Sequence, residues 1–343
     1  MSDEHLKKFI THFPEYRVAV VGDLMLDRYT WGSATRISQE APVPVVKVAR
    51  ETQAPGGAAN VVANLLGLGS KAGTFGFVGD DLHGNRLRKL LVDSGAEDAG
   101  IFKHPKRHTT VKTRVICNHQ QVVRIDHEAA FPLGPGDDCF VHLKQALCEN
   151  LKAGYYDALI FEDYAKGLLS AELMEEVVEV ARDNGVVTAL DPHPSHNFKV
   201  KNLSLITPNR AEAFALAGMY AAPAVTPLKD DKSLLEVGRC LLEQWAPQHL
   251  LITLGGQGMA LFTLGAEAPL HIPTRAKSVY DVSGAGDTVT ASFVLALLSG
   301  ASPRECAQVA NHAAGIVVGK VGTVPVTVAE LLENLEESCD TDE

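Results

Sequence analysis

The chain has 343 residues, of which 46% are hydrophobic, and its 42 acidic side chains outweigh 31 basic ones to give a net charge of −11. This balance argues against a protein that binds nucleic acid or a membrane surface, although a local basic cluster can still bind a phosphate. The length suits one large domain or two average ones. Six cysteines without a C-x-x-C pair are not a disulfide scaffold in a chain this long, so we expect a reducing cytoplasm.

Neither a targeting signal nor a membrane span is predicted. Residues 1–16 are charged and lack the apolar run of a signal peptide. The longest apolar stretches, such as residues 293–298, are far shorter than the roughly 20 residues that cross a bilayer. We therefore expect no membrane partner and a cytoplasmic location.

Strand and helix signals alternate along most of the chain. Residues 18–21 are a short β-branched run before Gly22, and glycines at 56 and 57 precede an apolar-periodic helix over 58–68. Further strands are predicted at 73–78, 158–161, 186–190, 203–206 and 250–253, and further helices at 85–93, 138–151, 172–184, 212–218, 234–245, 288–298, 304–319 and 328–336. Repeated βα units predict an α/β fold whose mainly parallel sheet binds ligands beyond the carboxyl ends of its strands.

The segment between residues 28 and 128 has a different pattern. Residues 109–116 and 122–127 alternate with a period of two around a polar turn, which predicts an antiparallel hairpin, and residues 42–48 are a further strand of this kind. We expect strands from about 28–50 and 108–128 to form a small second sheet. It belongs to a single domain over 1–338, and 339–343 form a tail.

A glycine-rich segment stands where a phosphate-binding loop is expected. The sequence has neither a G-x-x-x-x-G-K-[ST] loop nor a G-x-G-x-x-G after the first strand. It has Gly284-Ala285-Gly286-Asp287 directly before an apolar helix, whose free N–H groups favour an anion. Asp287, on a first turn where a carboxylate stays ionised, can accept the proton of an attacking hydroxyl. The alternative is an ordinary glycine-rich loop with an aspartate cap.

A second glycine pair opens an earlier helix. Gly56 and Gly57 are followed by Asn60 at the predicted helix start. One interpretation is a tight turn that only begins the helix. The other is close backbone contact with a sugar, with Asn60 donating to a hydroxyl.

Together, Gly56-Gly57-x-x-Asn60 with Gly79 downstream and Asp281-x-x-Gly-x-Gly-Asp287 resemble the two signatures of the ribokinase/PfkB family of sugar kinases. The resemblance covers nearly the whole chain. It implies the ribokinase-like fold, ATP with Mg²⁺ and possibly K⁺ as cofactors, and a small-sheet lid that closes over substrate and pairs two subunits in a homodimer. In that family the final aspartate, here Asp287, is the catalytic base, and the residues at 284, 285 and 286 form an anion hole.

The resemblance also implies roles for other residues. Asp27 would bind sugar hydroxyls together with the Gly56 segment, and Asp281 and Ser283 fall where a monovalent cation is bound. The motif Asn209-Arg210-Ala211-Glu212 would organise Mg²⁺ and the ATP phosphates through water. Nucleotide contacts are implied for Thr253, Gly255, Gly258, Asn311 and Gly315.

Within the family, residues 22–29, 36–45, 120–126 and 313–323 are similar to kinases of D-glycero-D-manno-heptose 7-phosphate. These phosphorylate the anomeric hydroxyl, giving the 1,7-bisphosphate on the way to ADP-heptose and lipopolysaccharide core. They are often the N-terminal half of a bifunctional chain. Because no H-x-G-H nucleotidyltransferase motif is present, we expect a stand-alone kinase. The alternatives are another PfkB-type sugar kinase, such as a fructose type, or a catalytically inactive regulatory relative.

A substrate that already carries a phosphate needs cations. Lys112 and Arg114 lie two apart on a predicted strand and share one face, Arg124 lies on the partner strand, and Arg36 is a comparable candidate. The alternative is a solvated basic edge that prevents sheet pairing.

Three other polar segments remain. In Glu162-Asp163 one carboxylate is expected to meet sugar hydroxyls, with Asp163 favoured, and the alternative is a helix cap. His193 follows Asp191-Pro where the family has a lysine, which makes that contact pH-dependent. The histidines at 104–108 and 193–196 could suggest a metal site, but neither group lies on a clear helix face, so both are expected in solvated loops.

Overall fold

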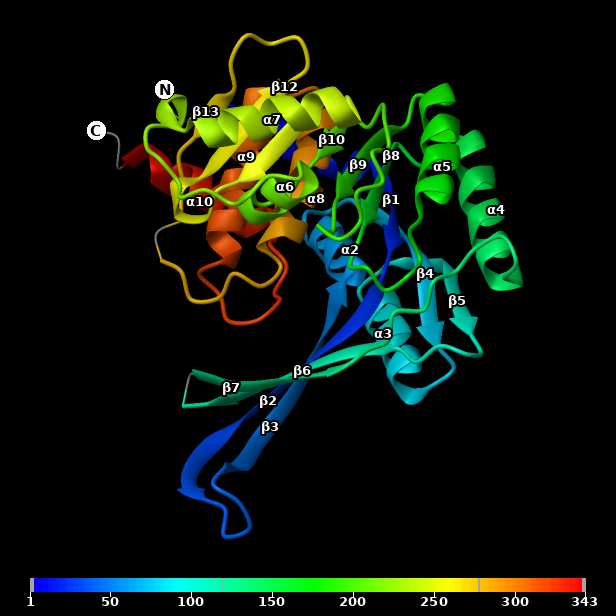
Figure 1. Cartoon of the computed structure of the whole chain (residues 1–343), viewed down its shortest axis with the longest axis vertical. Coiled ribbons are helices and arrows are strands. Elements are labelled where there is room, and N and C mark those ends of the chain that lie inside the picture. The colour runs from blue at the N-terminus through cyan, green and yellow to red at the C-terminus, as the bar shows by residue number, and fades with distance from the viewer. Residues whose placement is uncertain (1–2, 119, 277, 341–343) are drawn as a thin grey trace.

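Two β-sheets organise the computed structural model, which describes residues 3–118, 120–276 and 278–340 (Figure 1). In these residues the large sheet has nine strands in the order β13-β12-β11-β10-β9-β8-β1-β4-β5, and the small sheet has four in the order β3-β2-β6-β7. The large-sheet strands are β1 Arg17–Gly22, β4 Lys71–Gly79, β5 Glu97–His104, β8 Ala158–Glu162, β9 Val187–Asp191, β10 Leu205–Ile206, β11 His249–Thr253, β12 Met259–Thr263 and β13 Leu270–Ile272.

The large sheet is parallel from β11 to β5, and β12 pairs antiparallel with both of its neighbours. The helices are α1 Lys7–Ile10, α2 Ala58–Gly67, α3 Leu82–Asp93, α4 Asp138–Lys152, α5 Ala171–Asp183, α6 Arg210–Leu216, α7 Lys232–Trp245, α8 Ala285–Leu298, α9 Pro303–Val317 and α10 Val328–Asp340. The predicted α/β architecture with a mainly parallel sheet is confirmed. The last helix runs past residue 338, where the tail was predicted to follow, and residues 341–343 lie outside the described residues.

Helices cover both faces of the large sheet, and β1 shows why. Val18 and Val20 pack into one apolar cluster with α2, α8 and α9, whereas Ala19 and Val21 pack into a second cluster with α4, α5 and α7. Successive strand residues point to opposite faces, so a continuous apolar run suits a strand that is buried on both sides. In the described residues no helix is long and apolar enough to span a bilayer.

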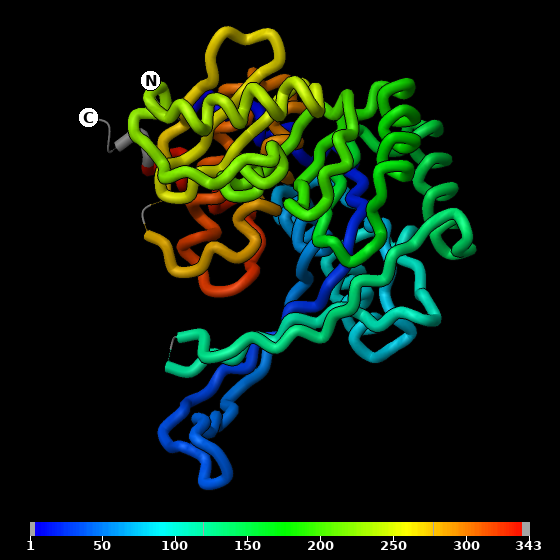
Figure 2. Tube along the Cα trace, in the orientation of Figure 1, coloured from blue at the N-terminus to red at the C-terminus, as the bar shows by residue number. Residues whose placement is uncertain are grey.

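The small sheet consists of β2 Leu24–Ile37, β3 Pro44–Gly57, β6 Thr110–Cys117 and β7 Gln120–His127. The outer part of the β2–β3 ribbon projects from the body, and β6 pairs in parallel with the inner part of β2, from Met25 to Gly32 (Figures 1 and 2). The predicted β6–β7 hairpin is confirmed, although residue 119 of its turn lies outside the described residues. Strands β5, β12 and β13 and the full length of β2 were not predicted.

His104 shows the consequence of missing β5. It ends that strand and is only 2% exposed, with its Nε2 2.8 Å from an Asp137 carboxylate oxygen and its ring against Phe77 and Phe131. The expectation of a solvated loop for this histidine was wrong. Because strand β5 was not predicted, its last residue was assigned to a loop. The hydrogen bond from His104 holds the pKa of Asp137 below its usual value.

Candidate active site

The N-terminal turns of α2 and α8 meet at the Asp287 carboxylate. Asn60, on the first turn of α2, donates from Nδ2 to Asp287 Oδ2 at 2.6 Å, and the Tyr164 hydroxyl donates to Oδ1 at 2.8 Å. Gly284 precedes α8 with φ of 79°, and a Cβ there would lie 2.5 Å from Asn60 Nδ2. Only glycine fits this close approach. The two glycine segments identified in the sequence are thus joined by a hydrogen bond across 227 positions of the chain.

Asp287 is only 4% exposed, and burial raises the pKa of its carboxyl group. The hydrogen bonds from Asn60 and Tyr164 act in the opposite direction, because they stabilise the ionised form. Burial thus opposes the ionisation that was expected from the helix start, and the two hydrogen bonds support it. A raised pKa makes a carboxylate a better proton acceptor near neutral pH. Burial also raises the pKa of Tyr164 well above its usual value, so this hydroxyl remains a donor.

Tyr164 is a site residue that the sequence analysis missed. Its loop is held by Asp23, at the end of β1, whose Oδ2 accepts from the backbone N–H groups of Tyr164 at 3.2 Å and Lys166 at 2.9 Å. Arg107 donates from Nη2 to the Lys166 carbonyl at 2.9 Å and lies 3.6 Å from Asp23. No local sequence pattern predicts that a tyrosine in such a loop is functional. Its position directly after Asp163 was the one feature that could have indicated it.

A group of buried carboxylates lies beside Asp287. Ligand oxygens of Glu162, Asp191 and Asp287 all lie within 4.8 Å of one another. Glu162 is 0% exposed, and neither of its carboxylate oxygens has a hydrogen-bond partner among the described residues. Burial raises the pKa of Glu162 and Asp191 well above their usual values, and the neighbouring carboxylates add to this. Carboxylate oxygens crowded in this way suit a hard divalent cation.

A cavity of about 600 Å³ opens beside these groups, at the carboxyl ends of β9 and β11. Its walls contain all the residues for which nucleotide contacts were predicted, together with the Asp287 segment and Asp163. These residues are Asn209, Arg210, Ala211, Glu212, Thr253, Gly255, Gly258, Asn311, Gly315, Gly284, Ala285, Gly286, Asp287 and Asp163. Segments that are distant in the sequence thus form one cavity at the carboxyl ends of the strands, which is where parallel sheets bind ligands.

The N-x-x-E segment has a structural explanation of its own. Asn209 and Glu212 form a capping box at the start of α6, with the Asn209 side chain accepting from the Glu212 N–H at 3.0 Å and the Glu212 carboxylate accepting from the Asn209 N–H at 2.8 Å. Burial raises the pKa of Glu212. Arg210 is paired with Asp231 at 2.8 Å, so its guanidinium already has a partner.

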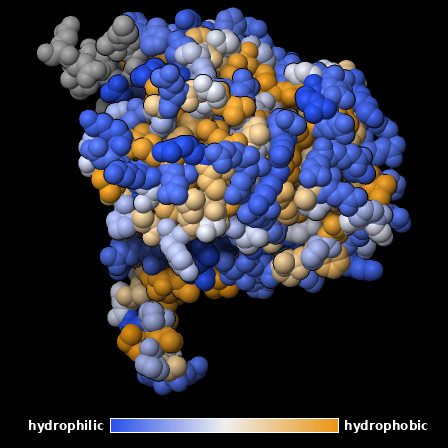
Figure 3. All heavy atoms as spheres, turned by 45° about the horizontal axis from the view of Figure 1, so that its top comes forward, coloured by the Kyte–Doolittle hydropathy of each residue, from blue (hydrophilic) through white to orange (hydrophobic). Residues whose placement is uncertain are grey.

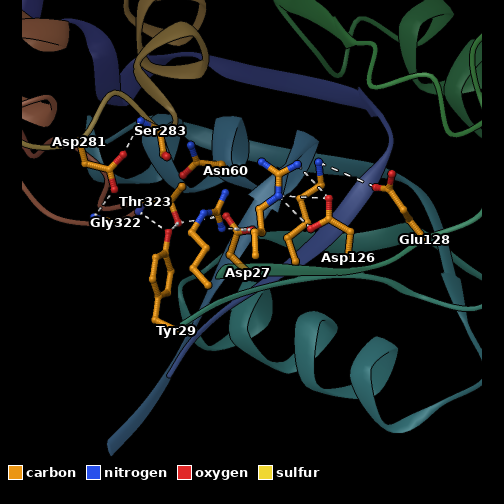
Figure 4. A network of polar contacts seen from close by, with 12 residues as sticks. Asp27, Tyr29, Asn60, Asp126, Glu128, Asp281, Ser283, Gly322 and Thr323 are labelled. Atoms are coloured by element: carbon orange, nitrogen blue, oxygen red, sulfur yellow. Dashed lines mark hydrogen bonds and ion pairs between the residues drawn. The ribbon is translucent and has the colours of Figure 1, made fainter. Parts of the chain in front are cut away.

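The polar network in Figure 4 marks a second part of the site, on the small sheet. Asp27, 4% exposed, accepts from Arg114 Nη1 at 2.7 Å, and burial raises its pKa while the guanidinium acts to lower it. A Cβ on Gly56 would lie 2.9 Å from the Asp27 carboxylate, so this glycine leaves room for the side chain. Gly57, with φ of 57°, then turns the chain into α2. Asp27 is thereby placed at the junction of the small sheet and the body.

At one end of this network, Asp281 accepts from the backbone N–H groups of Ser283 at 2.9 Å and Gly322 at 3.0 Å. Burial acts to raise the pKa of Asp281, but these hydrogen bonds hold it below its usual value. The lowered pKa favours the ionised form of the Asp281 carboxylate.

Some predicted substrate residues already have partners within the chain. Arg124 is paired with Asp126 at 2.9 Å, and Arg36 is exposed on the projecting ribbon. Asp163 lies 2.8 Å from His196 Nδ1. His193 and His196 lie in a loop, as expected, and both are only partly exposed.

This fold and cavity, with a buried carboxylate at the start of a glycine-initiated helix, define a phosphotransferase that acts on a hydroxyl group. The model of the pfkB family carbohydrate kinases matches residues 16–329, and the chain belongs to that family of sugar kinases. Kinases of the ribokinase-like fold use ATP and a divalent metal ion.

The curated relatives are bifunctional. The bifunctional protein HldE of Geobacter sulfurreducens is 39% identical over 98% of this chain, and that of Pelobacter propionicus is 41% identical over 91%. This chain spans 66% and 62% of the lengths of those relatives.

Solved structures share the fold. Phosphofructokinase-2 from Escherichia coli, in complex with substrates and products, superimposes with a TM-score of 0.75 at 18% identity, covering 94% of this chain and 99% of that one. Arabidopsis thaliana ribokinase complexed with ribose and ATP superimposes with a TM-score of 0.70 at 21% identity, again covering 94% of this chain and 99% of that one.

Proposed function

We propose that this chain transfers the γ-phosphoryl group of ATP to the anomeric hydroxyl of D-glycero-D-manno-heptose 7-phosphate, giving the 1,7-bisphosphate used for ADP-heptose and lipopolysaccharide core. Membership of the sugar kinase family and the similarity of residues 22–29 and 36–45 to heptose-phosphate kinases support this substrate. The observation that carries the reaction is the Asp287 carboxylate, oriented by Asn60 and Tyr164 in the wall of the cavity.

The chain's own groups account for the chemistry as follows. Asp287 accepts the proton of the attacking sugar hydroxyl. The oxygen of that hydroxyl forms a bond to the γ-phosphorus, and the bond between the γ-phosphorus and the leaving oxygen of ADP breaks. Such a base contributes ~10²–10⁴ in rate. Backbone N–H groups of residues 284–286 would stabilise the charge on the transferring group, and one such donor contributes ~10²–10³ in rate. In this structure the Ala285 N–H donates to the Val282 carbonyl at 3.2 Å, so it would have to exchange that partner for the phosphoryl oxygen. Nucleotide contacts come from the other cavity walls, and sugar contacts from Asp27, Asn60, Asp163 and the Gly56–Gly57 turn.

Mg²⁺ fits the carboxylates of this site. Glu212 lies in the cavity wall, and the crowded, partnerless oxygens of Glu162 show that the region favours positive charge. When bound, the ion neutralises charge on the ATP phosphates. K⁺ fits Asp281 and Ser283, because the Asp281 carboxylate is held in its ionised form.

The small sheet would also form a homodimer. Its projecting ribbon exposes Ile37 by 62%, Val43 by 51% and Val48 by 51%, and Val123 and Ile125 on β7 are 46% and 48% exposed. Figure 3 shows apolar side chains gathered on this ribbon. Contiguous apolar surface of this kind is typical of a protein interface. Because the reaction consumes ATP, we place the protein in the cytoplasm.

The test is a kinase assay on the two synthetic anomers of D-glycero-D-manno-heptose 7-phosphate, with fructose 6-phosphate for comparison. We expect ATP-dependent formation of the 1,7-bisphosphate, identified by mass and by the position of the new phosphate. A preference for fructose 6-phosphate would refute the assignment of heptose 7-phosphate as the substrate. Failure to phosphorylate any sugar phosphate would refute the reaction and favour an inactive relative.

A further inference from the structure

Two lysines from distant parts of the chain converge on one carboxylate. Lys166, in the loop after β8, lies 2.9 Å from Glu128 Oε1, and Lys112, on lid strand β6, lies 3.9 Å from Glu128 Oε2. Both lysine side chains are mostly buried, with exposed fractions of 16% and 19%, whereas the glutamate side chain is 29% exposed. Mostly buried ammonium groups bind an anion more strongly than surface groups do.

The neighbouring charges are already paired one to one. Arg114 contacts Asp27 at 2.7 Å, and Arg124 contacts Asp126 at 2.9 Å. Two ammonium groups therefore face Glu128, although Lys112 also lies opposite Asp27 and Asp126 and helps to keep both carboxylates ionised. Figure 4 shows Glu128 at the end of this network opposite Asp281.

The cluster lies on the sugar side of the site. Lys112 is the register partner of Asp27 on β2, and Lys166 is two residues from Tyr164, which contacts the catalytic base. Glu128 follows β7, in the segment that leads from the lid back to the body. That segment is attached to the Lys166 loop, because the Phe131 N–H donates to the Lys166 carbonyl at 3.1 Å. The cluster thus joins the lid to the body.

We infer that Lys112 and Lys166 form the binding site for the phosphate that the sugar substrate already carries, and that Glu128 occupies this site until the sugar phosphate replaces it. This rests on the proposed function and deepens it. A phosphate dianion matches two ammonium groups, whereas a carboxylate matches one. Glu128 is the most exposed of the three side chains and can leave. The exchange favours phosphorylated sugars over neutral ones, which cannot displace the carboxylate.

The test measures binding to the full chain by calorimetry, with D-glycero-D-manno-heptose 7-phosphate, the unphosphorylated heptose and a non-hydrolysable ATP analogue. The variants are Lys166→Met, Lys112→Met and Glu128→Gln. The matched control is Lys144→Met, which removes a lysine paired with Glu176 at 2.7 Å on the outer helices. We expect each methionine variant at the cluster to weaken heptose 7-phosphate binding by roughly 10- to 100-fold, the range for a hydrogen bond to a charged group. Binding of neutral heptose and of the ATP analogue is unchanged, and Glu128→Gln tightens the binding of heptose 7-phosphate.

Either of two results in the variants would overturn the inference, as would the wild-type result given below: unchanged sugar-phosphate binding in both lysine variants, or an equal loss for phosphorylated and neutral sugars. Melting temperature and ATP-analogue affinity verify that each variant is folded. The same measurements with fructose 6-phosphate and fructose separate this inference from the choice of substrate. If heptose 7-phosphate is not the substrate but the lysine variants still lose the preference for a phosphorylated sugar, the inference stands and the substrate assignment fails. A wild-type protein without any preference for phosphorylated sugars overturns it.

Discussion

Replacement of Tyr164 by phenylalanine tests whether this hydroxyl keeps the catalytic base ionised. The hydroxyl donates to Asp287 Oδ1 at 2.8 Å, and this hydrogen bond lowers the pKa of a carboxyl group that burial raises. Its removal raises the pKa of Asp287 further, so a smaller fraction of the base is ionised at acid pH. A hydrogen bond to a charged group contributes about 1.5–3 kcal/mol. We therefore expect Tyr164→Phe to lower kcat/KM by about 10- to 100-fold on the acid limb of the pH profile.

The sign of the effect depends on pH. Above the pKa of Asp287 both enzymes have an ionised base, so the difference shrinks as the pH rises. The assay is the full pH dependence of kcat/KM for wild type and variant. Tyr155→Phe is the matched control, because that exposed hydroxyl donates to Glu97 at 3.2 Å, away from the cavity. A loss that is equal at every pH would show that Tyr164 only positions the base and would refute the reasoning.

Three further predictions concern the base, the sugar turn and the stability of the body. Asp287→Asn is expected to fold normally, since the amide is isosteric, and to lose at least ~10²-fold in kcat; unchanged turnover with an unchanged melting temperature would remove the aspartate from the mechanism. Gly56→Ala places a methyl group 2.9 Å from the Asp27 carboxylate, so we expect a raised KM for the sugar at an unchanged KM for ATP, and a parallel rise of both would show a general distortion instead. His104→Ala is expected to lower the free energy of unfolding in urea by about 1–3 kcal/mol at neutral pH, because it removes a buried partner. The pKa of Asp137 is lowered in the folded state, so the stability that this hydrogen bond contributes is lost as the pH falls through the folded-state pKa of Asp137. A difference in unfolding free energy between wild type and variant that grows toward acid pH would contradict this account.

The extent of sequence-based prediction differed between the two sheets. The parallel strands and their helices were predicted because each is a continuous apolar run next to a periodic helix, which is a local signal. Strand β2 was missed over most of its length, because its outer half is only partly covered by the protein and has no strict alternation. Strand β5 was missed as well, and with it the burial of His104.

In the catalytic site, local signals identified the residues but not their relations. The Asp287 helix start and the Gly56–Gly57 turn were recognisable because both depend on small residues directly before a helix. The partners of the Asp287 carboxylate were not recognisable, since Asn60 and Tyr164 reach it across 227 and 123 positions of the chain. Its burial, which raises its pKa, likewise comes from elements distant in the sequence.

By itself, then, the amino-acid order determined the α/β class, the sugar kinase family and the position of the glycine-initiated helix that carries Asp287, because periodicity and helix-start residues act over a few neighbouring positions. Only the tertiary structure decided which donors hold that base and which two lysines face Glu128. These relations depend on how strands and loops cross in space, and both hydrogen bonding and desolvation act at distances of a few ångströms, whatever the separation along the chain.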